Sequence, residues 1–369
     1  MPPALPLFFL SLCFATVAAA DLHPAWVMAE GGIFRTWLNQ ANGELSPPER
    51  IAEVSAASWL TTHPRHRILY ASFASEGSSG IMAYAFEDDG SLAQRGQVLV
   101  ESGWPTHIAV DPAGSLIASA HWGAGTVSLA RLHQNGVPDS AVETLTFALP
   151  FQGAGPSPVQ TQSRSHWVGF SADERLLYVT DLGNDCVWVL EPQANPLALR
   201  IRAKIELPPG SGPRHISQGV DGRFAYVNGE FDHSVTQLRR TGEQGMFEAL
   251  SSQSTLGRTD HEPRNNTSEI RVHPSGQFLY VGNRGHDSIA VFSLDAETGA
   301  PHPIEREPIR GVWPRDFDFD PSGQWMIVGG QHSNSLTSFA IDQTTGQLTF
   351  SRHRVTVPNP VRVLFVPSR

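Results

Sequence analysis

Short apolar runs alternate with tight turns along most of the chain. The clearest example spans residues 212–235, GPRHISQGVDGRFAYVNGEFDHSV, where two alternating apolar runs flank Asp221-Gly222. An Asp-Gly pair between such runs is a strong signal for a β-hairpin. This stretch therefore predicts two antiparallel strands joined by a tight turn.

The same hairpin phrase recurs along the chain. Its turn residues, in chain order, are His66, Gly114, Glu174, Gly222, Gly276 and Gly323. The shortest interval between copies is 47 residues and the longest is 60 residues. Each turn is followed by an apolar run such as RLLYVT, a small polar loop and a further run such as DCVWVL. Four short antiparallel strands per unit of about 45–55 residues are the pattern of a β-propeller blade.

The two ends of the chain predict a seventh blade. The C-terminal run VRVLFVPSR at 361–369 matches RDFDFDPSG at 315–323, which is an innermost strand of the repeat. The N-terminal runs AWVMAE and GGIFRTWL, followed by NGEL at 42–45, are typical of the outer three strands. We expect the last strand to complete the blade begun by the first three, because this closes the ring and removes an exposed edge. Residues 21–369 are thus predicted to form one all-β, seven-bladed β-propeller domain.

Composition and the N-terminus narrow the function classes. The net charge is −10 and no stretch supplies a basic stripe, which argues against nucleic-acid binding. Residues 1–20 hold an apolar run ending in Ala18-Ala19-Ala20, which predicts a cleaved secretory signal peptide and a periplasmic or secreted protein without a membrane span. An uncleaved anchor or a mis-assigned start is the alternative. Cys13 falls in the signal and leaves Cys186 alone, so we expect no internal disulfide and no cysteine metal cluster.

The hairpin register predicts which side chains meet at one mouth of the central channel. The first strand of a blade lines the channel and the second runs back beside it, so residues equally far before and after the turn lie close together. Eight positions from the turns, this reasoning selects a ring of polar residues: His166, Arg214, Glu230, Arg284 and Arg315. The next position along the first strands adds His107, His215, Glu269 and Asp316.

The sharpest constellation in this ring is formed by His166, Arg214, Glu230 and Arg284. Two guanidinium groups can hold a carboxylate or polarise a carbonyl group. An imidazole and a carboxylate nearby can move protons at neutral pH. The same pattern also allows a buried structural ion pair between Arg214 and Glu230.

A structural interpretation is favoured for several neighbours of this constellation. Propellers use inner-strand polar residues to connect blades, and this role is favoured over a catalytic one for His107, His215 and Asp316. Trp104, Trp122 and Trp313 fall near the same rim. They can stack on a sugar or an aromatic ligand, although packing between blades is the default for such residues.

Three phrases resemble the lactonase family of seven-bladed propellers, namely GSGPRH (210–215), FAYVNGE (224–230) and LYVGNRGHDSIAVF (279–292). This family includes bacterial 6-phosphogluconolactonases and fungal carboxy-cis,cis-muconate cyclases, and the resemblance covers essentially the whole mature chain. It implies an active site of one histidine, two arginines and one glutamate, which fall on His166, Arg214, Arg284 and Glu230. Two positions depart from the family pattern: Arg164 replaces the first histidine of an H-x-H phrase, and Gly229 separates Asn228 from Glu230.

The resemblance implies a lactone hydrolase acting on a sugar-acid lactone, without metal or cofactor. His166 would be the general base, the two arginines would bind the anionic group and the oxyanion, and Glu230 would orient water or protonate the leaving alkoxide. Residues expected to complete the substrate site are His215, Arg315, Glu269 and His107. The expected export leaves open whether the lactone is phosphorylated. Alternatives are a muconate-type lactonising cycloisomerase, or a non-enzymatic propeller that binds a protein or envelope ligand. We expect a monomer or a weak oligomer.

Overall fold

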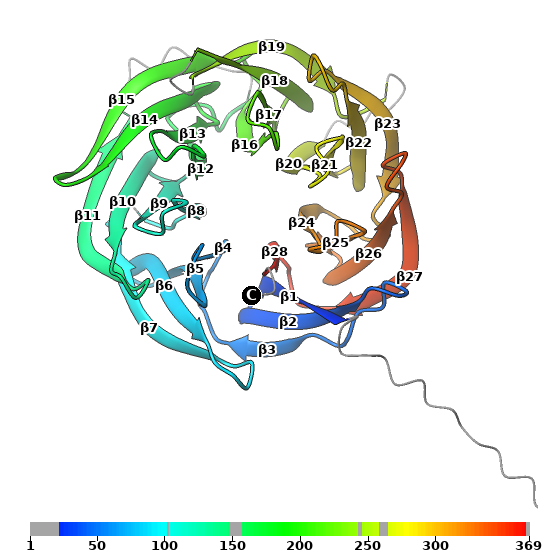
Figure 1. The fold of residues 1–369 in the computed structure, drawn as a ribbon, viewed down its shortest axis with the longest axis horizontal. Coiled ribbons are helices and arrows are strands. Elements are labelled where there is room, and N and C mark those ends of the chain that lie inside the picture. The colour runs from blue at the N-terminus through cyan, green and yellow to red at the C-terminus, as the bar shows by residue number, and fades with distance from the viewer. Residues whose placement is uncertain (1–21, 102, 148–156, 243–245, 258–264, 367–369) are drawn as a thin grey trace, which may run out of the picture.

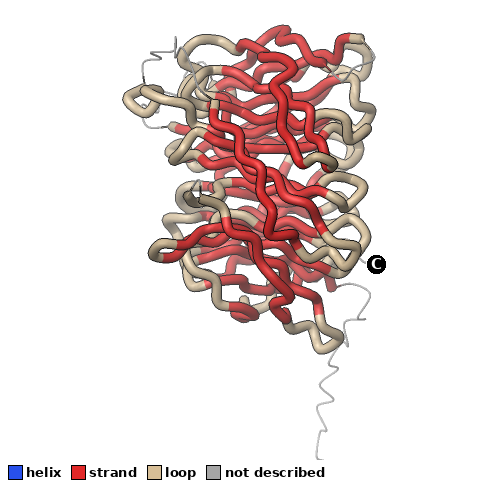
Figure 2. Tube along the Cα trace, turned by 90° about the vertical axis from the view of Figure 1, so that its left-hand side faces the viewer, coloured by secondary structure: helices blue, strands red, loops and turns tan. Residues whose placement is uncertain are grey.

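The computed structural model describes residues 22–101, 103–147, 157–242, 246–257 and 265–366. Seven four-stranded antiparallel sheets are arranged in a ring (Figure 1). In the side view, the strands run through the thickness of the ring and loops lie at both faces (Figure 2). The described residues contain no helix, and hence none that is long and apolar enough to span a membrane. The predicted all-β, seven-bladed propeller is confirmed, whereas the predicted signal peptide lies outside the described residues.

The blades are numbered in chain order, and their strands are given from the innermost outwards. Blade 1 consists of β28 (Arg362–Phe365), β1 (Leu22–Ala29), β2 (Gly32–Asn39) and β3 (Glu49–Ala52). Blades 2 and 3 consist of β4 (Leu60–Thr62), β5 (Ile68–Ser75), β6 (Ser78–Phe86) and β7 (Leu92–Leu99), and of β8 (His107–Val110), β9 (Leu116–His121), β10 (Thr126–Leu132) and β11 (Pro138–Thr146). Blades 4 and 5 consist of β12 (Ser165–Phe170), β13 (Leu177–Asp181), β14 (Cys186–Ala194) and β15 (Leu197–Glu206), and of β16 (Pro213–Gln218), β17 (Phe224–Gly229), β18 (Ser234–Thr241) and β19 (Met246–Ser254). Blades 6 and 7 consist of β20 (Asn266–Val272), β21 (Phe278–Arg284), β22 (Ser288–Leu294) and β23 (Pro301–Pro308), and of β24 (Pro314–Phe319), β25 (Trp325–Gly330), β26 (Ser335–Ile341) and β27 (Leu348–Thr356).

Blade 1 joins the two ends of the chain, as the sequence predicts. β28 pairs with β1 in antiparallel register from Ala25–Phe365 to Met28–Arg362. Val27 and Val363 oppose each other in this register and are both fully buried in one hydrophobic cluster. The ring is therefore closed by backbone hydrogen bonds and by apolar packing between segments from opposite ends of the sequence.

Five of the six repeated turns share a backbone conformation, and the turn at His66 in blade 2 does not. Gly222 lies at φ +68° and its N–H donates to the carbonyl of Gly219 at 3.0 Å. Glu174 occupies the equivalent position of blade 4 at φ +63°, where the other four turns of this conformation have glycine. The turn is thus set by the hairpin as a whole, and a non-glycine residue tolerates the left-handed conformation there at some cost.

Buried tyrosines tie neighbouring blades together. Tyr226 on β17 and Tyr280 on β21 are buried, and each hydroxyl donates to a glycine carbonyl of the following blade, at 2.7 Å in both cases. Tyr70 makes the equivalent bond to Gly136 at 2.6 Å. Burial, the largest cause, raises the pKa of all three phenols, so they stay protonated donors at neutral pH. These three tyrosines therefore supply a specific bond between blades as well as core volume.

Candidate active site at the channel mouth

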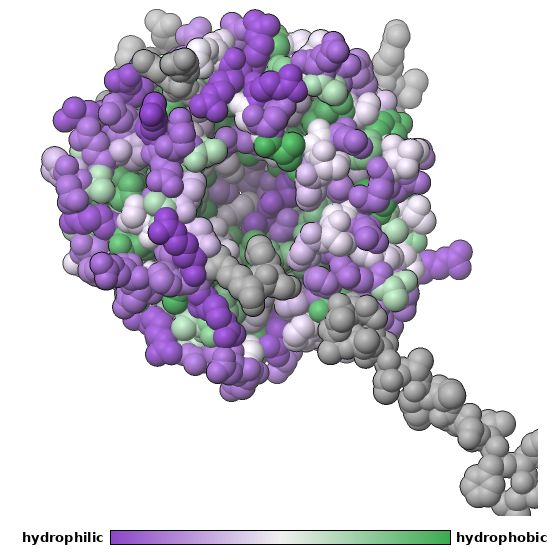
Figure 3. All heavy atoms as spheres, in the orientation of Figure 1, coloured by the Kyte–Doolittle hydropathy of each residue, from purple (hydrophilic) through white to green (hydrophobic). Residues whose placement is uncertain are grey.

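A cavity of about 770 Å³ opens at one mouth of the channel. It is lined by Ser58, Glu101, Gly103, Trp104, Thr106, Trp122, Gly123, Ala124, His166, Arg214, Glu230, Arg284 and Arg315. The four residues of the predicted constellation all line this cavity, together with Arg315. The five side chains that lie eight positions from the turns were predicted to meet at one mouth of the channel, and they line the same cavity there. Figure 3 shows the face of the ring at the other end of the channel, which is largely hydrophilic and hollowed at its centre.

β-Bulges on the innermost strands aim these side chains. In blade 4 the register shifts between Ser165 and Trp167, so that His166 is the extra residue with no partner on β13. Arg315 is the extra residue of the equivalent bulge in blade 7. In blade 5 the shift falls between Pro213 and Ile216 and includes Arg214. Bulges redirect a side chain and end regular pairing, which explains why these residues point to the cavity instead of following the strand alternation.

Glu230 bridges the two arginines of the constellation. Its Oε1 lies 2.9 Å from Arg284 Nη2 and its Oε2 lies 3.3 Å from Arg214 Nε. All three side chains are largely buried, and the predicted proximity of Arg214 and Glu230 is confirmed. One guanidinium therefore contacts each oxygen of the carboxylate.

Backbone carbonyl groups fix the same two arginines. Arg214 Nη1 donates to the carbonyl of Ser268 at 2.5 Å and to His215 Nε2 at 3.2 Å. Arg284 Nη2 donates to the carbonyl of Thr267 at 2.7 Å. Burial, followed by repulsion from Arg284, lowers the pKa of Arg214 to about 9. Arg214 therefore remains charged near neutral pH, and the backbone carbonyl groups hold both guanidiniums in place before any ligand arrives.

His166 is buried yet makes no hydrogen bond to the described residues. Its Nδ1 is inaccessible to solvent and has no partner there, and its ring lies 5.1 Å from that of His215. Burial, followed by the nearby charge of Arg214, holds the pKa of His166 well below its usual value. The imidazole is therefore neutral at pH 7 and able to accept a proton. A histidine that only connected blades would be expected to make at least one such bond.

Arg315 supplies positive charge that the site does not neutralise. Within the described residues it forms no ion pair with a carboxylate, whereas Glu230 is shared by two other guanidiniums. Burial, followed by repulsion from Arg284, lowers the pKa of Arg315 to about 10, which still leaves it charged at pH 7. We call the part of the cavity lined by Arg214, Glu230, Arg284 and Arg315 its inner half. This half holds three cations and one anion, so it attracts negatively charged groups although the protein as a whole is acidic.

A second polar layer lies beneath the cavity and does not line it. His215 Nδ1 lies 3.2 Å from Glu269 Oε2, and its other nitrogen accepts from Arg214. His107 packs on Trp59 with a centroid distance of 4.1 Å and accepts a long 3.4 Å bond from the Val168 N–H. The structure therefore separates these three predicted substrate-binding residues from Arg315. Their contacts favour a role in positioning, and substrate binding by them stays a prediction.

The residues that support the site were not identified from the sequence. The buried carboxylate of Asp185 accepts from the N–H groups of Gly210 and Gly212 at 2.7 and 2.8 Å, and from Gln160 Nε2 at 2.8 Å. It thereby joins the loop before Arg214 to the loop before His166. The repeat did contain a signal for the role of Asp185. Asp287 holds the equivalent position before the third strand of blade 6, and it accepts from the Trp313 N–H at 2.7 Å.

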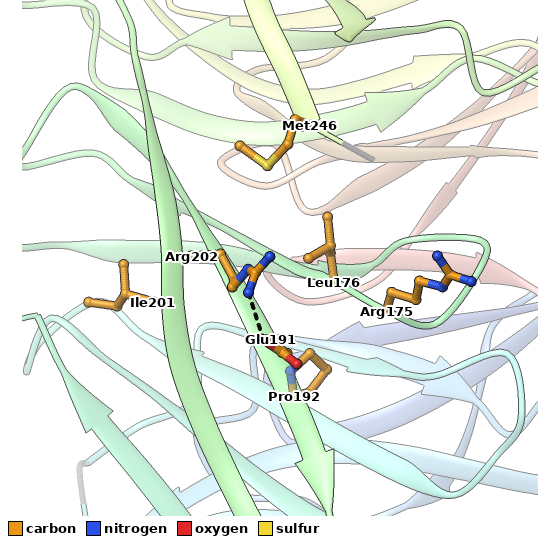
Figure 4. Close-up of a pocket in the computed structure, with 7 residues that line it drawn as sticks. All are labelled: Arg175, Leu176, Glu191, Pro192, Ile201, Arg202 and Met246. Carbon is orange, nitrogen blue, oxygen red and sulfur yellow. Dashed lines mark hydrogen bonds and ion pairs between the residues drawn. The ribbon is translucent and has the colours of Figure 1, made fainter. Parts of the chain in front are cut away.

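A further cavity of about 700 Å³ lies away from the channel, beside the outer strands of blade 4 (Figure 4). Its lining is an exposed ion pair, Arg202–Glu191 at 3.4 Å, with the apolar side chains of Leu176, Ile201 and Met246. None of its lining residues is a histidine or a serine, and its one carboxylate is already paired. In the described residues, no group of three or more His, Cys, Asp or Glu side chains could hold a metal ion. Of the two cavities, the one at the channel mouth therefore has the side chains better suited to catalysis.

Comparisons with known proteins agree with this fold. A family model described as "Lactonase, 7-bladed beta-propeller" matches residues 24–365. A 6-phosphogluconolactonase of Bacillus subtilis is 30% identical over 336 residues, which are 91% of this chain and 94% of that protein. The solved structure of a periplasmic gluconolactonase of Pseudomonas aeruginosa has a TM-score of 0.86 at 27% identity, covering 94% of this chain and 99% of the other. The chain therefore belongs to the lactonase family of seven-bladed β-propellers.

Proposed function

We propose that the protein is a hydrolase that opens a sugar-acid lactone at the channel mouth. The observation that carries this proposal is a neutral histidine whose ring makes no hydrogen bond to the described residues and which faces a cavity that also contains fixed guanidiniums. Family membership and relatives named as 6-phosphogluconolactonases support the same reaction class. A fold alone would not support it, since propellers host many functions.

In the proposed mechanism, His166 accepts a proton from water as the water oxygen adds to the lactone carbonyl carbon. The carbonyl oxygen becomes an oxyanion, which the guanidiniums of Arg214 and Arg284 stabilise without reorganising. When the tetrahedral intermediate collapses, the bond from the carbonyl carbon to the ring oxygen breaks. The ring oxygen leaves as an alkoxide and takes the proton from the His166 imidazolium. The product is a hydroxy acid, which ionises and releases one proton to solvent.

The contacts of Glu230 argue for a role different from that of an acid. Each of its two oxygens is engaged by one guanidinium, at 2.9 Å from Arg284 and at 3.3 Å from Arg214. We therefore assign Glu230 to holding Arg214 and Arg284 at a short separation, where both can reach one oxyanion. Arg315, which has no such partner among the described residues, is assigned to an anionic or strongly polar substituent of the substrate.

We extend the proposal to the compartment and to phosphorylation. Residues 1–20 have the apolar run and the A-x-A-like end of an export signal, and one structural relative is a periplasmic gluconolactonase. Both observations favour action outside the cytoplasm, on a lactone without a phosphate group.

The test is hydrolysis of glucono-δ-lactone and 6-phosphogluconolactone, with the spontaneous rate subtracted. Three forms are compared: the parent protein, His166→Ala, and His302→Ala as a control on the outer strand β23. We expect activity in the parent and the control, and a loss of about a hundredfold or more in His166→Ala. A folded parent that opens neither lactone, or a fully active His166→Ala variant, would contradict the proposal. Formation of a lactone from a carboxymuconate would instead support the cycloisomerase alternative.

A further inference from the structure

The outer half of the cavity is aromatic, in contrast to the charged inner half. Trp104 and Trp122 line it, together with Gly123 and Ala124. Trp104 is 49% exposed, which is unusual for so large an apolar side chain. Isolated surface tryptophans need no explanation, but this one lies at the entrance of the proposed active site. The contacts that hold Trp104 in place indicate whether its exposure belongs to a binding surface.

A buried histidine fixes the loop that carries Trp104. His121, at the end of β9, is fully buried, and its Nδ1 lies 3.0 Å from the carbonyl oxygen of Gly103. Its Nε2 lies 3.0 Å from Ser119 Oγ. Burial lowers the pKa of His121 to about 4, so the neutral ring donates from Nδ1 and accepts from the serine hydroxyl. The residue before Trp104 is therefore anchored to the core of blade 3.

Trp122 is fixed from the neighbouring blade. The guanidinium of Arg164 stacks on the Trp122 ring at 4.2 Å and donates to the Gly123 carbonyl at 3.3 Å. Gln162 Nε2 donates to the same carbonyl at 2.9 Å, and the Trp122 N–H donates to Thr106 Oγ1 at 3.2 Å. Arg164 is one of the two departures from the family pattern, and its role here is to hold the rim of this half of the cavity.

A second cavity adjoins the first at Trp104. This second cavity, of about 460 Å³, shares Glu101, Gly103 and Trp104 with the first and continues outwards over blade 2. Trp104 thus lies between two adjoining hollows, and a ligand that fills both must pass it. Polar groups that can bind hydroxyls border this path, namely the Glu101 carboxylate and the hydroxyls of Ser75 and Ser79. One lactone ring held between His166 and the arginines would leave the outer space to water.

We propose that this outer half is a subsite for a second sugar ring, so that the substrate is the lactone of a disaccharide aldonic acid. The inference rests on the proposed lactone hydrolysis and adds the size of the substrate to it. Sugar rings carry an apolar face of C–H groups that packs on a tryptophan face, and hydroxyls at their edge that need polar partners. Trp104 is held in place between the inner half of this cavity and the adjoining 460 Å³ cavity. It offers the apolar face, and the hydroxyls of the adjoining cavity offer the polar partners.

The experiment compares kcat/KM for lactobiono-δ-lactone, whose gluconolactone unit carries a galactosyl group, with kcat/KM for glucono-δ-lactone. The variants are Trp104→Ala and Trp37→Ala, the latter a control at a 37% exposed tryptophan on β2 of blade 1. In the parent and in Trp37→Ala we expect the ratio of the two values to favour the disaccharide lactone by about fivefold or more, through KM. In Trp104→Ala we expect the ratio to fall to about one.

An equal preference in the parent, or a ratio unchanged by Trp104→Ala, would overturn the subsite while leaving lactone hydrolysis intact. If neither lactone is opened, the proposed function fails, and the subsite is then judged by calorimetric binding of lactobionate and gluconate. Tighter binding of lactobionate that is lost in Trp104→Ala would support the subsite even then. Equal binding of the two acids would overturn it.

Discussion

Asp316 offers a test of the buried polar layer beneath the site. It is fully buried, and its Oδ2 accepts from Arg362 Nη1 at 2.9 Å and from the Val363 N–H at 2.6 Å. Its Oδ1 has no donor among the described residues. Burial, which outweighs the attraction of Arg362, and the nearby carboxylate of Glu269 raise the pKa of Asp316 to about 7. The side chain thus keeps a proton in the folded protein that an unfolded aspartate releases near pH 4.

The sign of the pH dependence follows from the proton count. Between about pH 4 and pH 7 the folded state binds more protons at this site than the unfolded state, so the free energy of unfolding falls as pH rises through that window. A rise in pKa from about 4 to about 7 corresponds to roughly 4 kcal/mol, at about 1.4 kcal/mol per pKa unit. The substitution Asp316→Asn removes the titration. The asparagine oxygen can still accept from Arg362 and Val363, and its NH₂ group replaces the carboxylic proton.

The assay is urea unfolding of the parent and Asp316→Asn at pH 4, 5, 6, 7 and 8, followed by circular dichroism. The difference between the two proteins isolates Asp316, because the buried histidines titrate in both. We expect the variant to gain on the parent by a few kcal/mol between pH 4 and pH 8. A difference that stays constant with pH, or that favours the parent more at pH 8 than at pH 4, would refute the reasoning.

Three further outcomes are expected. Because burial and the charge of Arg214 hold the pKa of His166 well below its usual value of 6.5, the acidic limb of the kcat/KM profile should lie below pH 6.5, and a limb near pH 7 would exclude this residue as the base. Glu230→Gln should lower kcat/KM while lowering the inhibition constant of gluconate by roughly threefold, because the cations that it bridges lose their anion; weaker gluconate binding would contradict this. Phe365→Ala, in the strand that closes the ring, should reduce the free energy of unfolding by about 3–5 kcal/mol. The exposed control Val220→Ala should change it by less than about 0.5 kcal/mol, and equal effects of the two would contradict the closure.

The blade repeat and the residues at the channel mouth were predictable from the sequence, because both follow from the regular spacing of the hairpin turns. Equal spacing about the Asp221-Gly222 turn sufficed to bring Arg214 and Glu230 together, since antiparallel pairing is symmetric about a turn. The bulge at His166 was not predictable, because one unpaired residue leaves no mark on the apolar pattern. The position of Trp104 likewise depends on His121, which is eighteen residues from the Gly103 carbonyl that it binds. Such contacts between loops carry no periodic signal, and they determine the inner and outer halves of the cavity.

The strand pairing in blade 1 places a limit on when the protein can finish folding. β1 begins at Leu22 and its inner partner β28 begins at Arg362, so 340 residues of chain must be made between them. At about 10 residues per second, a ribosome takes roughly half a minute to make that stretch. Throughout this interval the three outer strands of the blade have an unpaired inner edge, to which a neighbouring nascent chain can add a strand. Synthesis of β28, and not any local folding step, sets the earliest moment at which that edge is protected.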